Sequence, residues 1–167
     1  MGKMFLMCGL SGAGKTTFAK KFAEDNGYKY LGIDDFYIRN YGDYDDPDDS
    51  FYVWIDFFKA IHKAELANED VVIDTNAPTL VKRLQFIDWF PTFDEHNLIY
   101  IQADRDLRRR NNASRKRVVP DDEMERMEQE FKSPVAFWEG SFTVMELGWD
   151  RCRAFINTDN HLTEILQ

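Results

Sequence analysis

The sequence predicts an α/β protein built on a five-stranded parallel sheet with helices on both faces. Short apolar runs alternate with helical patterns along the chain, and a glycine-rich turn joins the first run to the first helix. The chain has 167 residues, 44% of them hydrophobic, with fourteen Phe. This length and composition fit one domain, residues 1–167, with a substantial buried core.

The predicted strands are short apolar runs bounded by polar residues or glycine. In chain order they are 3–9 (KMFLMCG), 28–33 (YKYLGI), 71–75 (VVIDT), 97–103 (NLIYIQA) and 153–157 (RAFIN). Helical patterns separate them, so we expect parallel strands joined by helical crossovers. Ligands of such sheets bind at the carboxyl ends of the strands.

The predicted helices are indicated by apolar spacing and by cap or stop residues. Phe18 and Phe22 lie one turn apart, Gly27 and Pro91 act as stops, and Ser50 can act as a cap. The expected spans are 16–26, from Ser50, 79–90, from about Asp104, from Pro120, 135–147, and a C-terminal segment after residue 157.

The loop after the first strand carries the most specific motif. Its sequence, GLSGAGKT, matches G-x-x-x-x-G-K-[ST] between a predicted strand and a predicted helix. Glycines let backbone N–H groups converge on phosphate oxygens, Lys15 reaches the β- and γ-phosphates, and the Thr16 hydroxyl ligates Mg²⁺. The sequence therefore predicts a P-loop NTPase fold that binds a nucleoside triphosphate. The candidate nucleotide-binding residues are Gly9, Ser11, Gly12, Ala13, Gly14, Lys15, Thr16 and Thr17.

Three classes of P-loop protein compete for this sequence: phosphotransferases, GTPase switches and ATPase motors. The chain lacks the N/T-K-x-D motif that reads guanine, and Asp74 at the end of the third strand is followed by Thr75, not by the Glu usual in motors. A kinase needs a base, an Mg²⁺ site and mobile cations. The strand ends offer the carboxylates of Asp34, Asp35 and Asp74.

A basic segment at residues 104–117 offers the cations. It holds seven Arg or Lys against two Asp, although the whole chain has a net charge of −9. One interpretation is a solvated helix face. The other is a helical lid at about residues 104–120 that closes over phosphates, because NNAS interrupts the helical pattern within the run.

Together these motifs resemble the kinase domain of bacteriophage 5′-polynucleotide kinase and its P-loop kinase relatives, over about residues 1–127. The similar segments are GLSGAGKTTFAKKF, IDDFY, VVIDTN and RRRNNASRKRVVPDDEMERM. The resemblance implies a three-layer fold like that of nucleoside monophosphate kinases, with ATP and Mg²⁺ as cofactors. It implies Asp34 as the general base and Arg110 or the Ser114–Arg115 region as the group that stabilises the transferring phosphoryl. It also implies that Asp74, Thr75 and Asn76 support the active site. The candidate metal ligands are Thr16 and Asp74.

The acceptor side departs from that family. Where the family has an arginine for the acceptor phosphate, this chain has Tyr37, with Arg39 two residues later. Asp35 is either a helix N-cap or an acceptor ligand. The candidate substrate residues are Asp35, Tyr37, Arg39, Thr75 and Asn76.

Five further aspartates at residues 43–49 are either a solvated connector or a filter against polyanions. Like the net charge of −9, they disfavour a nucleic-acid acceptor.

The sequence thus predicts an ATP-dependent kinase acting on the hydroxyl of a small-molecule or nucleotide-type acceptor. The alternatives are a 5′-hydroxyl polynucleotide kinase, and an ATPase or regulatory module without an acceptor. No apolar stretch approaches the length of a membrane span. Cys8 and Cys152 match no metal spacing and suggest the reducing cytoplasm.

Overall fold

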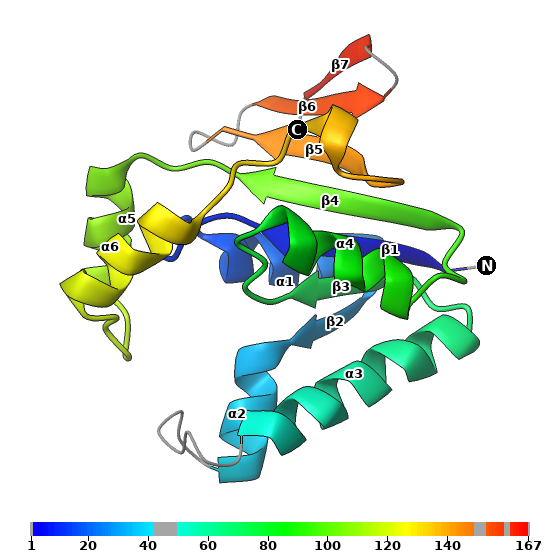
Figure 1. Cartoon of the computed structure of the whole chain (residues 1–167), viewed down its shortest axis with the longest axis horizontal. Helices are drawn as coiled ribbons and strands as arrows, with labels where there is room; N and C mark the ends of the chain where they lie inside the picture. The colour runs from blue at the N-terminus through cyan, green and yellow to red at the C-terminus, as the bar shows by residue number, and fades with distance from the viewer. Residues whose placement is uncertain (1, 42–49, 149–152, 159–160, 167) are drawn as a thin grey trace.

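The computed structural model describes residues 2–41, 50–148, 153–158 and 161–166. The strands are β1 (Lys3–Cys8), β2 (Lys29–Gly32), β3 (Val71–Asp74), β4 (Glu95–Ile101), β5 (Thr143–Leu147), β6 (Arg153–Thr158) and β7 (His161–Leu166). They form one sheet of order β2-β3-β1-β4-β5-β6-β7 (Figure 1). The first five are parallel, and β6 and β7 add antiparallel strands at one edge. The predicted fold class is confirmed.

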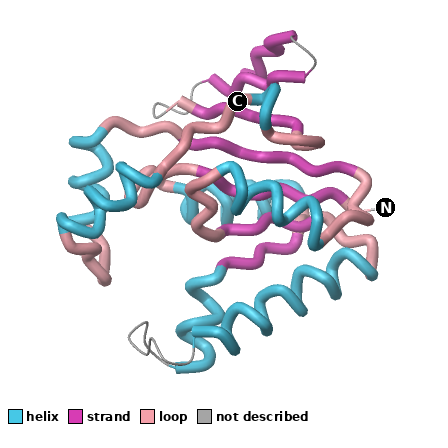
Figure 2. Tube along the Cα trace, in the orientation of Figure 1, coloured by secondary structure: helices cyan, strands magenta, loops and turns pink. Residues whose placement is uncertain are grey.

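Helices lie on both faces of this sheet (Figures 1 and 2). They are α1 (Lys15–Asn26), α2 (Ile33–Tyr41), α3 (Ser50–Leu66), α4 (Leu80–Trp89), α5 (Arg105–Ala113) and α6 (Asp121–Glu130), with a 3₁₀ turn, η2 (Ala136–Trp138). Several predicted boundaries are confirmed. Gly27 ends α1 at φ 69°, and the Thr79 and Asp104 side chains accept hydrogen bonds from the first turns of α4 and α5.

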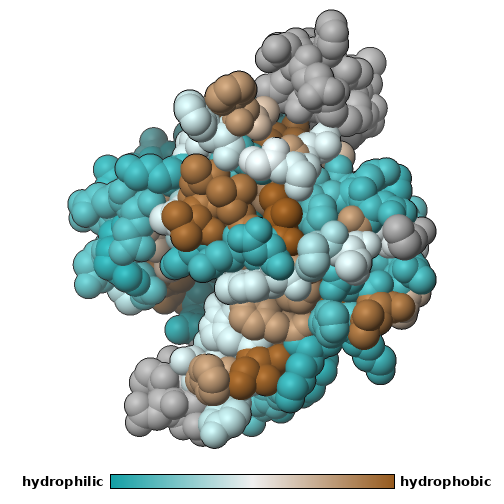
Figure 3. Space-filling model, turned by 45° about the vertical axis from the view of Figure 1, so that its right-hand side comes forward, coloured by the Kyte–Doolittle hydropathy of each residue, from teal (hydrophilic) through white to brown (hydrophobic). Residues whose placement is uncertain are grey.

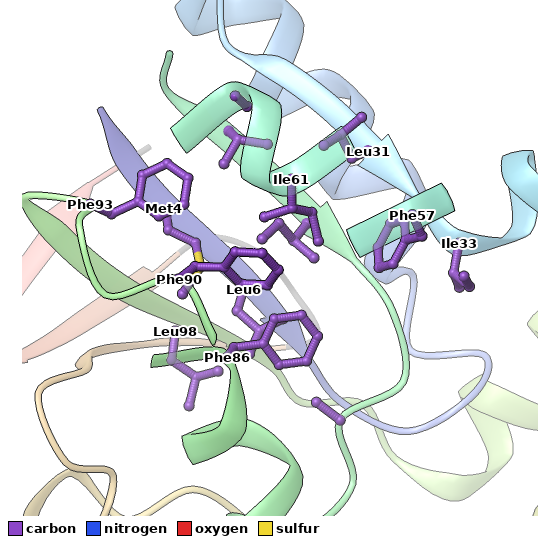
Figure 4. Packing of buried hydrophobic residues seen from close by; sticks show 14 of the residues in the cluster. Met4, Leu6, Leu31, Ile33, Phe57, Ile61, Phe86, Phe90, Phe93 and Leu98 are labelled. Carbon is purple, nitrogen blue, oxygen red and sulfur yellow. The ribbon is translucent and has the colours of Figure 1, made fainter. Parts of the chain in front are cut away.

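Alternate residues of β1 face two separate cores, as expected for a strand covered on both sides. Met4 and Leu6 pack in a cluster with α3 and α4, where Phe57, Ile61 and Phe86 contribute (Figure 4). On the opposite face, Phe5 and Met7 pack in a second cluster with α1. Because β1 is buried on both faces, its position in the sheet is fixed. The phosphate loop begins directly after β1, so its starting point is fixed too.

The end of the chain differs from the prediction. Residues 135–147 were expected to form a helix, but they form the short turn η2 and then β5, which pairs in parallel with β4. The run RAFIN is a strand, yet it is the sixth and antiparallel, and β7 replaces the expected C-terminal helix. Only residues 148–152 join β5 to β6, too few for a helical crossover, so the chain must return as a hairpin.

A buried ion pair ties α4 to the segment after α6. The Arg83 and Glu139 side chains are each 1% exposed, and Arg83 Nε and Nη2 donate to the two carboxylate oxygens at 2.8 and 2.7 Å. Arg83 Nη1 also donates to the carbonyls of Ala77 and Lys132, at 3.3 and 2.9 Å. Because the pair is bidentate and reaches two further carbonyls, the charges are buried with their hydrogen bonds satisfied.

The surface in Figure 3 is mostly polar, with apolar patches between polar residues. Among the described residues, Val81, Phe137 and Trp138 are well-exposed large apolar side chains. None of the helices in the part of the chain that the structure describes is long and apolar enough to cross a membrane.

Candidate active site

The phosphate loop, residues 9–16, turns tightly between β1 and α1 and packs against the end of β4 and the start of the basic segment. A Cβ atom at Gly9 would lie 2.6 Å from the carbonyl oxygen of Ile101, and one at Gly12 would lie 2.4 Å from that of Arg108. Gly12 also has φ 82°, in the left-handed region that favours glycine. A side chain at either position would push the loop away from its supports.

The N-terminus of α1 opens toward this loop. Gly14 precedes the helix and provides no side-chain cap, so the first backbone N–H groups remain available to an anion. The Asn111 Nδ2 donates to the Gly12 carbonyl at 2.8 Å, which fixes the loop from the side of α5. The predicted nucleotide-binding residues therefore form one continuous segment, made of the loop and the first turn of α1.

Lys15 lies half-buried under the loop. Its ammonium donates to the Leu10 carbonyl at 3.2 Å. Burial lowers the pKa of Lys15, while the carboxylates of Asp74 and Asp34 oppose that shift. The charge of Lys15 is thus held by its own loop and by two strand-end carboxylates, beside the position where phosphate oxygens would bind.

Thr16 and Asp74 meet at the base of the loop. The Thr16 Oγ1 donates to Asp74 Oδ2 at 2.5 Å, and the Tyr30 hydroxyl donates to the same oxygen at 3.0 Å. Asp74 is 7% exposed. A hydroxyl and a carboxylate are oxygen ligands of the kind that Mg²⁺ takes alongside phosphate and water. No cage of three or more metal-ligating side chains occurs among the described residues, and Mg²⁺ bound to a nucleotide does not require one.

Asp34 lies in the first turn of α2, where β2 ends. Burial, and then the charge of Asp74, raise the pKa of Asp34, while Arg117, Arg115 and Lys15 act in the opposite direction. One side of Asp34 remains open to solvent. The structure therefore brings the predicted base to Lys15 and Asp74, as its position at a neighbouring strand end suggested.

Asp35 does not cap a helix. Helix α2 begins at Ile33, so Asp35 lies within its first turn, where the carboxylate is 3.8 Å from the Lys20 ammonium. The N-cap prediction for Asp35 is wrong because the helix begins without a loop after β2. An acidic residue in a first turn still complements the helix dipole.

The other candidate acceptor residues are dispersed. Thr75 is buried and its Oγ1 has no hydrogen-bond partner among the described residues, whereas Asn76 is exposed at the same strand end. Tyr37 packs against the larger core cluster. Arg39 lies over the Phe36 ring at 5.0 Å and lines a hollow of about 560 Å³ between β2, α2 and α3 that contains no phosphate-loop residue. The five aspartates at 43–49 lie outside the described residues.

Three arginines of α5 pair with α6. Arg105 and Arg109 lie 3.1 and 3.5 Å from Glu125, and Arg108 lies 2.8 Å from Glu128. Arg110 is exposed and, within the described part of the chain, makes no side-chain hydrogen bond or ion pair. Much of the positive charge of α5 is therefore neutralised by the glutamates of α6.

The loop after α5 turns back toward the phosphate loop. Asn112 exchanges two hydrogen bonds with the backbone of Val119, at 2.8 and 2.9 Å, which closes this turn. Within it, Arg115 Nη1 donates to Ser11 Oγ at 3.3 Å, and Arg117 lowers the pKa of Asp34. Sequence reasoning missed Arg117 and Tyr30. The basic segment indicated Arg117 only as one of its seven cations, and no local sequence pattern indicated Tyr30.

Comparison with known proteins agrees with this geometry. A family model described as "AAA domain" matches residues 4–134. The chain belongs to this AAA domain family. The match ends just before η2 and β5, so it covers the phosphate loop, both strand-end carboxylates and the basic segment. No match was found among curated proteins.

Solved structures share the fold of this AAA domain. The Pnkp1/Rnl/Hen1 RNA repair complex has a TM-score of 0.68 at 16% identity, over 77% of this chain and 43% of that chain. A sugar kinase from Janibacter sp. HTCC2649 has a TM-score of 0.62 at 15% identity, over 87% and 86%. Kti12 from Chaetomium thermophilum, in complex with ADP-AlF3, has a TM-score of 0.61 at 16% identity, over 88% and 89%. The fold is that of the P-loop kinases, and the expected resemblance to polynucleotide kinase is confirmed at this level.

Proposed function

We propose that this protein is an ATP-dependent kinase that transfers the γ-phosphoryl group to a hydroxyl of a small-molecule or nucleotide-type acceptor. One observation carries the proposal. The ends of three neighbouring strands bring Lys15, Asp34 and the hydrogen-bonded pair Thr16–Asp74 together beside a phosphate loop.

The transfer assigns a role to each group. The acceptor oxygen attacks the γ-phosphorus, the bond to the β,γ-bridging oxygen breaks, and ADP leaves. Asp34 takes the proton of the acceptor hydroxyl, and its raised pKa makes it a better proton acceptor than an ordinary aspartate. Lys15 and the loop N–H groups hold the β- and γ-phosphates.

The metal-side residues and the arginines complete the site. Thr16 and Asp74 would hold Mg²⁺, which would supply positive charge to neutralise the phosphates of ATP. Arg115 and Arg117 come from the turn at 113–119, beside the phosphate loop, where their positive charges can stabilise the negative charge on the transferring phosphoryl group.

We further propose that the chain is one domain of residues 1–167, that residues 104–120 are its lid, and that the protein acts in the cytoplasm.

A 5′-hydroxyl polynucleotide kinase is the second candidate. It is favoured by the structural similarity to the Pnkp1/Rnl/Hen1 RNA repair complex. The net charge of −9 argues against a polyanionic acceptor, and Arg39, the cation nearest in sequence to the family's acceptor arginine, lines a hollow that contains no phosphate-loop residue.

The test is a transfer screen with γ-labelled ATP and Mg²⁺ over nucleosides, sugars, aminoglycosides and 5′-hydroxyl oligonucleotides. We expect one small-molecule class to become labelled. Lys15→Met should abolish labelling, and Asp34→Asn should lower it by about 10²-fold or more, as loss of a positioned base does. Label released only as phosphate, at a rate independent of every acceptor, would contradict the kinase assignment. Efficient, salt-sensitive labelling of the oligonucleotide would establish the second candidate instead.

A further inference from the structure

Asp74 Oδ2 accepts two side-chain hydrogen bonds. One comes from Thr16 Oγ1 at 2.5 Å and the other from the Tyr30 hydroxyl at 3.0 Å. Among the described residues, Oδ1 accepts none. A carboxylate held through one oxygen by two donors, one on α1 and one on β2, has little freedom to rotate, and its second oxygen keeps its capacity to accept.

The backbone around Tyr30 is shaped to let the ring reach Asp74. Tyr30 and Gly32 lie two residues apart on β2, so they face the same side of the sheet. A Cβ atom at Gly32 would lie 2.3 Å from the Tyr30 hydroxyl oxygen and 2.8 Å from Cζ. The ring therefore crosses the space that any side chain at position 32 would fill.

Helix α1 holds the ring from the other side. The Lys20 ammonium lies 5.2 Å from the centre of the Tyr30 ring, and the ring packs against the smaller core cluster. Burial and the nearby Asp74 charge raise the pKa of Tyr30, so the hydroxyl remains a donor at neutral pH. A phenylalanine would make the same packing contacts, so packing alone does not explain the hydroxyl.

We infer that Tyr30 is a positioning residue that orients the Asp74 carboxylate for metal binding, and that Gly32 provides the gap that admits it. Tyr30 acts through its hydrogen bond to Asp74. This inference rests on the proposed function, since it assigns Asp74 to the metal side of the kinase site. Hydrogen-bonded partners of metal ligands commonly account for 10- to 100-fold in metal affinity.

The test compares Tyr30→Phe with Tyr28→Phe, which removes a hydroxyl from the same segment. Tyr28 stacks on Phe5 at 5.2 Å, and its hydroxyl makes no hydrogen bond among the described residues. Binding of Mn²⁺ to the protein with a non-hydrolysable ATP analogue is measured by electron paramagnetic resonance. We expect Tyr30→Phe to weaken Mn²⁺ binding by about 10-fold, and Tyr28→Phe to leave it unchanged.

Two further measurements separate positioning from general damage. The melting temperature of Tyr30→Phe should stay within about 3 °C of the parent, as expected for a small change in stability. Gly32→Ala should weaken Mn²⁺ binding to a similar extent. Combining it with Tyr30→Phe should weaken Mn²⁺ binding little further, because both substitutions remove the same hydrogen bond between Tyr30 and Asp74. Parent-like Mn²⁺ binding by Tyr30→Phe would overturn the inference. Because this measurement needs no turnover, it remains decisive even if no acceptor is ever labelled.

Discussion

The two halves of the basic segment, residues 104–110 and 111–117, are both rich in positive charge but have different surroundings. In the first half, Arg105, Arg108 and Arg109 point to α6, whose Glu125 and Glu128 neutralise them. In the second half, Arg115 contacts Ser11 of the phosphate loop, and Arg117 acts on Asp34. The first half therefore pairs with α6, and the second half lies toward the phosphate loop and Asp34.

The difference arises from the next helix. Glu125 and Glu128 on α6 lie opposite the arginines of α5, whereas Arg115 in the turn at 113–119 contacts the phosphate loop. A run of positive charge thus indicates function only after the carboxylates that pair with it have been located. Four predictions test this division.

The largest expected effect is on turnover. Replacing both Arg115 and Arg117 by Ala should lower kcat by about 10³-fold, since arginines that face a transferring phosphoryl contribute on this scale. The melting temperature should not change, because both side chains are exposed. Labelled-ATP kinetics and thermal unfolding measure the two quantities.

The matched control for this pair is Lys116→Ala, which removes the charge between them. We expect less than about a threefold change in kcat, within the range of a remote surface charge. A loss of kcat below 10-fold in the double variant, or an equal loss in Lys116→Ala, would contradict a catalytic role for Arg115 and Arg117.

The second effect is on stability. Arg108→Ala should lower the free energy of unfolding by about 2–3 kcal/mol, because it removes the charged hydrogen bond between Arg108 and Glu128. The Arg108 side chain is 6% exposed, and it also donates to the Ala103 carbonyl. Urea unfolding followed by circular dichroism checks this value. Stability equal to that of the parent would show that α5 does not depend on α6.

The third effect is on pH dependence. Arg117 lowers the pKa of Asp34, so Arg117→Ala should raise that pKa further. A base must be deprotonated to act, so the acidic limb of kcat/KM should move to higher pH. The Arg105→Ala profile should overlay that of the parent. A limb that moved to lower pH in Arg117→Ala would mean that the titrating group is not Asp34.

The smallest effect is at the exposed pairs. Arg105→Ala should change the free energy of unfolding by less than about 1 kcal/mol, because Arg105 and Glu125 are each about half exposed and surface pairs contribute little. The difference should shrink further in high salt. A loss as large as that of Arg108→Ala would mean that exposure does not distinguish the two arginines.

Sequence patterns predicted the fold where local signals and topology agree. The apolar runs before Gly9 and up to Asp74 identified central strands because these strands are buried on both faces. The helix predicted at 135–147 was wrong because the apolar spacing of this stretch suits a helix as well as a strand. What decides its structure is the open edge of β4 and the short connection to β6, and neither is visible in a window of sequence.

The site divides in the same way. Lys15, Thr16, Asp34 and Asp74 follow strand ends, and strand ends of a parallel sheet converge, so their meeting could be predicted. The contribution of Tyr30 depends on a missing Cβ at Gly32 and on the register with β3. Such a contact spans two strands that are far apart in sequence, so no local motif indicates it.

The buried pair Arg83–Glu139 has a consequence for how this sequence can change over generations. Either residue alone is difficult to replace, because its partner would be left charged inside the protein. Replaced together by apolar residues of similar volume, the two positions can be tolerated or even favoured. A library randomised at both positions should therefore yield functional clones mainly as matched pairs, and lineages should cross between charged and apolar solutions only by a double step.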